Sequence, residues 1–258
     1  MQDLRRHLEV ISAIKEKLAD KSATLMNLTI SGSHLYGFTS KDSDIDYRGT
    51  FILNTGKLLS LKIGTNVVEM QNGEADIVLF ELSKEIKLAL AGNCNVLEHL
   101  NAKQIVSTAE YLKLKQLINN SWGKNGIYNS YKGMATFNYK KFILKGRSSV
   151  KKYLYIFRGL FAGIYALETG HIEPNVQVLN KRFKIPEVKT LIQLKIEGSE
   201  TGMVPKELDQ GQLERILNDL FQRIDKAYEK SKIPEKPEEE DVNKINEFLL
   251  NIRRDNFY

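Results

Sequence analysis

The sequence predicts an α/β (α+β) fold in which a small mixed sheet is followed by an all-helical domain. Two patterns support this prediction. Before about residue 90, apolar side chains alternate along short runs that are separated by turn residues, as they do in strands. Beyond that point, apolar side chains recur every three or four residues, which is typical of helices that bury one face.

The sheet is predicted from four runs. Residues 23–31 and 45–53 each form one strand, and residues 66–71 and 76–82 form a pair. Between the last two runs stands Asn72-Gly73, a dipeptide that favours the tight turn of a β-hairpin. Ser83 is predicted to cap the helix that comes next.

Helical spacing accounts for most of the remaining chain. An amphipathic helix is predicted over residues 1–18, and further helices over 95–100, 108–119, 134–144, 149–169, 188–197 and 212–232. A polar segment rich in Pro and Glu, 233–240, precedes a last helix. The predicted organisation is a sheet-containing domain over 1–92, a helical domain over 93–232, and a linker with a C-terminal helix over 233–258.

The composition is that of a globular protein without a membrane span. The 258 residues are 42% hydrophobic and 27% charged, and the most apolar stretch, 154–167, is too short to cross a bilayer. The single cysteine, Cys94, cannot form an intrachain disulfide, and no Cys/His cluster resembles a zinc site. We therefore expect a cytoplasmic location. The sequence does not indicate an oligomeric state.

Positive charge is concentrated in one part of the chain. The net charge is +6, yet residues 111–167 contain no Asp or Glu and carry eleven Lys or Arg, which leaves the remainder at −5. Such a block is typical of a surface that faces the phosphates of a nucleotide or a nucleic acid. The alternative is a set of solvated helix faces, although exposed helices normally interleave charges of both signs.

Two aspartates lie at the start of the second predicted strand. Asp44 and Asp46 are two residues apart, so on a strand both carboxylates point to the same face. Carboxylates held this close repel each other unless a cation lies between them, and hard oxygen ligands select Mg²⁺ or Mn²⁺. The alternative is an ordinary polar turn, because Ser-Lys-Asp-Ser-Asp is also typical of loops.

A Gly-Ser pair precedes these aspartates. Gly32 permits a close approach of the backbone, Ser33 offers a hydroxyl and an N–H, and a helical turn after them would point donors at an anion. A third carboxylate would complete a site for phosphoryl or nucleotidyl transfer, by holding a second ion or by deprotonating an attacking hydroxyl. Asp76, on a neighbouring predicted strand, is the candidate. Glu74 and Glu81 are weaker alternatives.

The pattern of an apolar residue, Gly-Ser, ten intervening residues and Asp-apolar-Asp resembles the active-site signature of the DNA polymerase β-like nucleotidyltransferase superfamily. The wider run GSHLYGFTSKDSDIDYRG, residues 32–49, is similar to a bacterial and phage branch of predicted nucleotidyltransferases, some of them associated with RNA ligases. The segments DIVLFELSKEIKLALAGNCNVLEHL and KKYLYIFRGLFAGIYALETG agree with it. The resemblance therefore spans residues 28–170.

This resemblance implies a sheet of nucleotidyltransferase type and a metal-dependent enzyme of the EC 2.7.7 kind. The enzyme would transfer a nucleoside monophosphate from an NTP, such as ATP, to an acceptor hydroxyl, with Mg²⁺ or Mn²⁺ as cofactor and pyrophosphate as the leaving group. The residues that match the family's site are Gly32 and Ser33 for the β- and γ-phosphates, and Asp44, Asp46 and Asp76 for the metal ions.

Several basic residues are candidates for holding the triphosphate or the backbone of a nucleic acid. They are Arg48, Lys140, Lys141, Lys151, Lys152 and Arg158; for Arg48 the alternative is an ordinary surface arginine. The basic, aromatic-rich block favours an RNA end, that of a tRNA included, as the acceptor. A protein or small-molecule hydroxyl is an alternative acceptor. An alternative to an enzyme is a module that keeps the fold and binds nucleic acid without catalysing a reaction.

Overall fold

The structure, a computed structural model, describes residues 2–61, 64–119, 121–198 and 208–256. Its sheet has five strands in the order β3-β4-β2-β1-β5. The strands are β1 (Ala23–Ile30), β2 (Ile45–Leu53), β3 (Val67–Asn72), β4 (Ala75–Glu81) and β5 (Gln104–Ser107). The pair β2 and β4 is parallel and the other neighbours are antiparallel, so the sheet is mixed, as predicted.

The predicted strands agree with the first four observed strands to within one residue at each end. The predicted hairpin joins β3 to β4: Asn72 pairs with Ala75, and Gly73, with φ of +61°, begins the two-residue turn. Edge strand β5 is not among the predicted strands. It has four half-buried residues, too few for an alternation of apolar and polar side chains to stand out.

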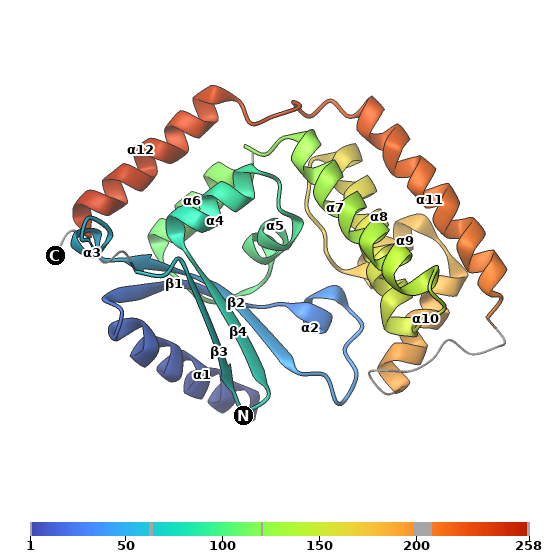
Figure 1. The fold of residues 1–258 in the computed structure, drawn as a ribbon, viewed down its shortest axis with the longest axis horizontal. Helices are drawn as coiled ribbons and strands as arrows, with labels where there is room; N and C mark the ends of the chain where they lie inside the picture. Colours follow the sequence, from blue (N-terminus) through green and yellow to red (C-terminus); the bar gives the residue numbers. More distant parts are fainter. Residues whose placement is uncertain (1, 62–63, 120, 199–207, 257–258) are drawn as a thin grey trace.

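The two faces of the sheet have different neighbours because side chains alternate along a strand. Helix α1 (Gln2–Ala19) packs Ile14 and Leu18 against the face that carries Tyr47 and Phe51 of β2. The opposite face of β2 carries Asp46, Arg48 and Thr50. Thr50 donates a hydrogen bond to the buried Glu85 of α4 (Leu82–Leu90). These polar side chains thus lie on the face opposite α1, and Figure 1 shows α4, α5 and α6 on the side of the sheet away from α1.

The other helices of the described chain include two that the sequence did not predict, and the rest differ from the predicted ones in extent. They are α2 (Gly32–Tyr36), α3 (Thr55–Leu58), α5 (Cys94–Asn101), α6 (Ala109–Asn119), α7 (Lys124–Asn138), α8 (Val150–Thr169), α9 (Val176–Phe183), α10 (Pro186–Glu197), α11 (Gln210–Lys230) and α12 (Glu239–Asp255). Helix α7 begins ten residues before the predicted 134 and continues into a π-helical turn, η1 (Tyr139–Ile143). Helices α3 and α9 are not among the predicted ones.

The cap of α4 differs from the prediction. Glu81, not Ser83, is the N-cap residue, and its carboxylate accepts a hydrogen bond of 2.8 Å from the Ser83 N–H. The physical reason is that β4 ends at Glu81 and α4 begins at the next residue, so the helix begins two residues earlier than a cap at Ser83 would require.

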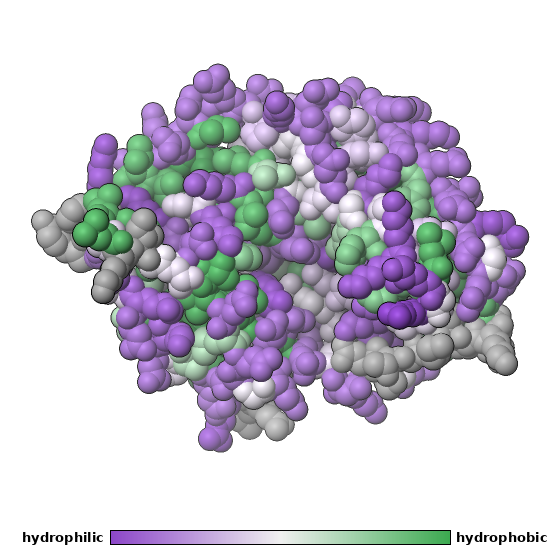
Figure 2. All heavy atoms as spheres, viewed as in Figure 1, coloured by the Kyte–Doolittle hydropathy of each residue, from purple (hydrophilic) through white to green (hydrophobic). Residues whose placement is uncertain are grey.

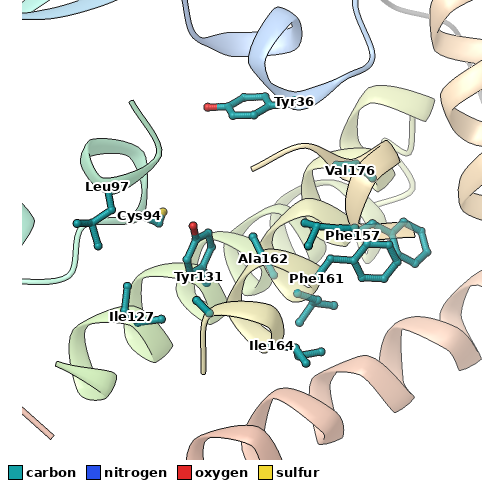
Figure 3. Packing of buried hydrophobic residues seen from close by; sticks show 14 of the residues in the cluster. Tyr36, Cys94, Leu97, Ile127, Tyr131, Phe157, Phe161, Ala162, Ile164 and Val176 are labelled. Atoms are coloured by element: carbon teal, nitrogen blue, oxygen red, sulfur yellow. The ribbon is translucent and has the colours of Figure 1, made fainter. Parts of the chain in front are cut away.

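A large hydrophobic cluster joins the helices to the sheet. Figure 3 shows Tyr131 of α7 beside Ala162 and Phe161 of α8, with Tyr36 of α2 facing the same group. A Cβ on Gly163 would lie 2.8 Å from the Cβ of Tyr131, so the absence of a side chain there lets α7 and α8 approach closely. Because Met26 and Ile52 of the sheet belong to this cluster too, it spans residue 92, and the division into domains stays a prediction.

The C-terminal part of the chain returns to the sheet. From α11, the segment 231–238 passes the start of α7, where the N–H of Lys124 donates to the carbonyl of Pro234 at 2.8 Å. Helix α12 then arches over α6 to the far end of the sheet (Figure 1). There the Arg253 guanidinium forms a buried ion pair with Glu81 and donates to the Leu53 carbonyl at 3.0 Å.

The surface seen in Figure 2 is mostly hydrophilic, with hydrophobic residues in separate groups. Within the described ranges, no helix combines the length and the apolar character that crossing a membrane requires.

Candidate active site

Asp46 and Asp76 lie side by side at the same end of the sheet. Each is near the start of its strand, and the parallel register pairs Asp46 of β2 directly with Asp76 of β4. Both belong to the face that turns away from α1, because Tyr47 and Ile77, the next residue on each strand, are buried beneath that helix. The predicted proximity of Asp76 to the aspartate strand is confirmed.

Asp44 lies apart from this pair. It precedes the first residue of β2 and is exposed, so the prediction that Asp44 and Asp46 share one strand face applies to Asp46 alone. In the described part of the chain, no three His, Cys, Asp or Glu side chains converge on a point where they could hold an ion. Asp44 therefore sits at the edge of the carboxylate site.

Arg48 lies between the two paired aspartates. Its Nη2 is 3.3 Å from Oδ1 of Asp46 and 3.1 Å from Oδ2 of Asp76. Its Nη1 donates to two backbone carbonyls, that of Tyr47 at 2.8 Å and that of Asp76 at 3.2 Å. The guanidinium is thus tied to both strands and neutralises part of the charge of both carboxylates.

The Gly-Ser turn lies against Asp46. Gly32 has φ of +61°, and a Cβ there would lie only 1.8 Å from Oδ2 of Asp46, so position 32 accepts only glycine beside this carboxylate. The Ser31 N–H donates to the backbone carbonyl of Asp46 at 2.8 Å, which fixes the turn to β2. The predicted helical turn forms as α2. The Ser33 side chain is buried, and its carbonyl accepts from the N–H groups of Gly37 and Phe38.

A pocket of about 300 Å³ opens beside these residues. Its wall combines the carboxylate site with the start of α5 and part of α8. The lining residues are Ser31, Gly32, Tyr36, Asp46, Arg48, Phe80, Leu88, Asn93, Asn95, Val96, His99 and Tyr155. It offers acidic, amide and aromatic groups in one cavity, which suits a ligand with polar and planar parts.

The charge of Asp46 is incompletely compensated. Burial raises the pKa of its carboxyl above the ordinary value; Arg48 opposes the rise and Asp76 adds to it. Lys151 and His34 also lower the pKa of Asp46, so both lie within electrostatic reach of it. Burial in turn lowers the pKa of His34. Burial thus disfavours the bare carboxylate, and carboxylate oxygens are the type of donor that Mg²⁺ or Mn²⁺ prefers.

Four of the predicted basic residues lie at the start of α8 and on η1. Lys152 lies 4.0 Å from the ring centroid of Phe142, and Lys141 lies 5.4 Å from the same centroid. The pKa of Lys152 is lowered by burial, and the nearby charges of Lys151 and Lys141 add to that effect. Lys140 is exposed on η1. Together with the effect of Lys151 on Asp46, this arrangement places the lysines on the side of the carboxylate site that α8 approaches.

Arg158 does not join them, contrary to the sequence-based expectation. Its side chain is 1% exposed and forms a buried ion pair with Glu98, with an Nη1–Oε2 distance of 2.9 Å. Its guanidinium also stacks 3.8 Å from the ring centroid of Tyr36. The physical reason is that α8 is buried almost all round, so a charge at position 158 points into the core and needs a partner.

Sequence reasoning did not find two polar contacts that support the site. Lys195 of α10 is buried and donates to the Ser40 hydroxyl at 2.6 Å, so the helical part holds the loop that leads to Asp44. His99, in the pocket wall, pairs with the buried Glu85 at 2.6 Å. Lys195 and His99 lie on amphipathic segments whose spacing alone predicts packing, so only the three-dimensional contacts reveal them.

The family model places the chain among the polymerase β-type nucleotidyltransferases. Residues 7–251 match the model of the RNA repair pathway DNA polymerase beta family, RlaP, and the chain therefore belongs to that family. The superfamily resemblance predicted from residues 32–49 is confirmed. Nucleotidyl transfer is the general chemistry of this family.

The proteins to which this chain is similar include the following three. An uncharacterized protein of Bacillus subtilis (strain 168), YcgL, is 26% identical over 229 residues, which cover 86% of each chain. An uncharacterized protein of Methanocaldococcus jannaschii, MJ0002, is 31% identical over 151 residues, 57% of this chain and 61% of its own. A crystal structure of a nucleotidyltransferase-like protein from Exiguobacterium sibiricum 255-15 aligns over 90% of this chain and 74% of its own, with 11% identity and a TM-score of 0.27.

Proposed function

We propose that the protein transfers a nucleoside monophosphate from an NTP to the hydroxyl of an RNA end. The observation that carries the proposal is the direct pairing of Asp46 with Asp76, with Gly32 packed against the Asp46 carboxylate. Membership of a family named for RNA repair supports RNA as the acceptor, as does the acid-free basic block over 111–167.

The chemistry follows from the residues at this end of the sheet. The acceptor hydroxyl attacks the α-phosphorus, a new P–O bond forms, and the bond to the α,β-bridging oxygen breaks so that pyrophosphate leaves. Asp44 and Asp46 would hold a divalent ion, which when bound supplies positive charge to the phosphate oxygens. Asp76 either shares in holding metal or accepts the hydroxyl proton.

The phosphates have two candidate contacts. The turn at Gly32 and Ser33 lies against Asp46, as the family resemblance requires of a β- and γ-phosphate turn. Lys151, at the start of α8, lies within electrostatic reach of Asp46, and its neighbours Lys152 and Lys141 lie within electrostatic reach of each other. A chain of phosphates running from the turn towards η1 would meet both groups.

The test is transfer of label. Each α-³²P-labelled NTP is incubated with Mg²⁺ and short RNAs that end in either a 3′-hydroxyl or a 3′-phosphate, and with a protein extract in parallel. We expect labelled RNA only from the 3′-hydroxyl substrate, with equimolar pyrophosphate, and none after addition of EDTA. Asp46→Asn should abolish labelling, while the control Asp219→Asn, at an exposed position of α11, should not. Label on protein alone would contradict the RNA assignment.

A further inference from the structure

Phe137, near the end of α7, is the one exposed aromatic side chain in the described part of the chain, and it is 57% exposed. Neighbouring rings turn inward: Tyr139 packs against Phe221 of α11 with ring centroids 5.8 Å apart, and Tyr153 is buried. A single exposed apolar side chain is ordinary on a protein surface. The groups around Phe137 therefore decide whether this ring has a function.

Lysines lie over the Phe137 ring and over the ring of Phe142. Nζ of Lys141 is 4.9 Å from the ring centroid of Phe137 and 5.4 Å from that of Phe142. Nζ of Lys152 is 4.0 Å from the Phe142 centroid, and Lys140 is exposed next to Lys141 on η1. We call Phe137, Lys140, Lys141, Phe142 and Lys152 the aromatic-lysine patch. It belongs to the acid-free basic block, so no acidic neighbour in the sequence offsets its charge.

The π-helical turn η1 explains how one lysine contacts both rings. On an α-helix, residues five apart differ in direction by about 140°, since each residue turns by about 100°. In η1 the N–H of Leu144 instead donates to the carbonyl of Tyr139, five residues back, at 3.1 Å. This turn holds more residues than an α-helical one, which brings the directions of Phe137 and Phe142 closer together.

The patch continues to the carboxylate site through the start of α8. Lys152 follows Lys151 in the first turn of α8, and the charges of Lys151 and Lys141 both act on the Lys152 ammonium. Lys151 in turn acts on the Asp46 carboxylate, whose pKa it lowers. A ligand that lies along the patch and extends past Lys151 therefore reaches the end of the sheet where Asp46 is paired with Asp76.

The combination of an exposed ring with lysines selects one form of RNA. Unpaired bases stack on aromatic side chains while lysines bind the phosphates between them. In a duplex the bases are already stacked on each other, and the major groove is too narrow for side chains to reach them. Duplex RNA could therefore use the lysines of the patch but not the Phe137 ring.

We propose that the aromatic-lysine patch binds the single-stranded end of the acceptor RNA, with an unpaired base stacked on Phe137. Lys141 lies over the ring, and the exposed surface of Phe137 receives the base. This inference rests on the proposed function, and it adds that the RNA end entering the carboxylate site is unpaired.

The experiment measures RNA binding by fluorescence anisotropy, without NTP, on the full-length protein. The probe is a fluorescein-labelled RNA of about 12 nucleotides, used alone or annealed to its complement. We expect the wild-type protein to bind the single strand at least about fivefold more tightly than the duplex. Phe137→Leu, which keeps an apolar side chain but has no ring, should weaken single-strand binding by at least about fivefold and leave duplex binding unchanged.

Two further variants separate stacking from apolar contact. Phe137→Trp keeps an aromatic face and should bind the single strand at least as tightly as the wild type. Leu250→Ala removes apolar surface from α12, where Leu250 is 47% exposed, and should change neither affinity. In all three variants the salt dependence of binding should equal that of the wild type, because no phosphate contact is removed. Thermal melts check that each variant is folded.

The outcomes separate this inference from the proposed function. Equal affinity of the wild type for single strand and duplex would overturn the inference and leave transfer to an RNA end intact. Unchanged single-strand affinity in Phe137→Leu would overturn it too, and so would equal losses in Phe137→Leu and Phe137→Trp. If the wild-type protein binds neither RNA at about 50 mM salt, both the inference and RNA as the acceptor are wrong.

Discussion

The Asp46 carboxylate lies in the space that a side chain at position 32 would fill: a Cβ on Gly32 would be 1.8 Å from Oδ2 of Asp46. The two residues belong to different elements, the turn after β1 and the start of β2. They are held together by the hydrogen bond from the Ser31 N–H to the Asp46 carbonyl. The glycine of the signature is therefore needed to let the acidic strand lie against the turn, in addition to any contact with phosphate.

Gly32→Ala should displace the Asp46 carboxylate and abolish transfer, with weaker Mn²⁺ binding. Part of its effect is general, because a residue with a Cβ pays about 1–2 kcal/mol at positive φ. Gly73→Ala is the matched control: its φ is also +61°, but nothing lies within 4 Å of its Cβ. Both variants should lose stability in thermal melts, Gly32→Ala by at least as much as Gly73→Ala, and only Gly32→Ala should lose Mn²⁺ affinity. Equal Mn²⁺ affinity in the two would contradict the role assigned to Gly32.

Asp46→Asn should stabilise the metal-free protein at neutral pH. Because the pKa of this carboxyl is raised in the folded chain, the folded protein binds a proton there more tightly than the unfolded chain does. This contribution to the free energy of unfolding is fully present below the ordinary pKa of 3.8 and is lost as pH rises through the folded pKa. The gain at pH 7 should be at most about 1 kcal/mol, because water screens a partly exposed group. It should vanish in melts below about pH 3.5. Saturating Mg²⁺ should reverse the order, since only the wild type gains from binding. A lower melting temperature for Asp46→Asn at pH 7 without metal would be the opposite result.

Arg158→Met should destabilise the fold severely. It leaves the fully buried Glu98 without its counter-charge, which costs about 3–5 kcal/mol for a buried pair. Adding Glu98→Gln should recover part of the loss, which chemical denaturation of the single and double variants measures. If Arg158 serves packing alone, the folded double variant should bind NTP with unchanged Kd. A tenfold weaker Kd would return Arg158 to the nucleotide site.

Local patterns in the sequence predict the carboxylate site because its geometry depends on local rules. Alternation along β2 and β4 determines which face each aspartate occupies, and the Asn72-Gly73 turn brings β4 back along the sheet. The adjacency of Asp46 and Asp76 follows from these two signals, whereas Asp44 lies before β2 and outside the alternation. The short strand β5 does not, because four residues carry too little periodicity.

Interactions between distant residues could not be predicted in this way. The local sequence does not distinguish Arg48 from an ordinary surface arginine. Its contact with Asp76 depends on the register between β2 and β4. Lys195 and Ser40 are 155 positions apart in the chain, and their hydrogen bond depends on how α10 packs. For Arg158, the charge pattern of the block 111–167 predicted exposure, whereas the apolar surroundings of α8 bury it. Net charge describes a segment as a whole and does not say which side chains reach its surface.

The C-terminal helix should stabilise the sheet through Arg253. Arg253→Met leaves the Glu81 carboxylate, 4% exposed, without its buried partner, and we expect a loss of about 3 kcal/mol or more. The neighbouring Arg254→Met is the matched control, because Arg254 lies on the exposed side of α12, where its guanidinium donates to the side-chain oxygen of Asn251. Thermal melts and proteolysis of the segment 231–238 measure the effect. Losses within about 0.5 kcal/mol of each other would contradict an anchoring role, since surface changes have that size.

RNA binding should depend steeply on salt through the lysines near α8. Each phosphate neutralised releases counterions, which gives a slope of about −0.7 per contact for single strands in a plot of log affinity against log salt concentration. Replacing Lys140, Lys141, Lys151 and Lys152 with Gln should flatten the slope between about 50 and 200 mM salt and weaken binding at every concentration.

The matched control replaces four exposed lysines outside the basic block, Lys15, Lys17, Lys226 and Lys230. It makes the same change in net charge, so a general effect of charge would alter both variants equally. If the salt dependence of RNA affinity falls only in the first variant, the contacts with RNA phosphates lie at the start of α8 and on η1. Parallel NTP titrations then separate the lysines that bind triphosphate from those that bind RNA. Absence of RNA binding by the wild-type protein at 50 mM salt would instead favour a protein or small-molecule acceptor.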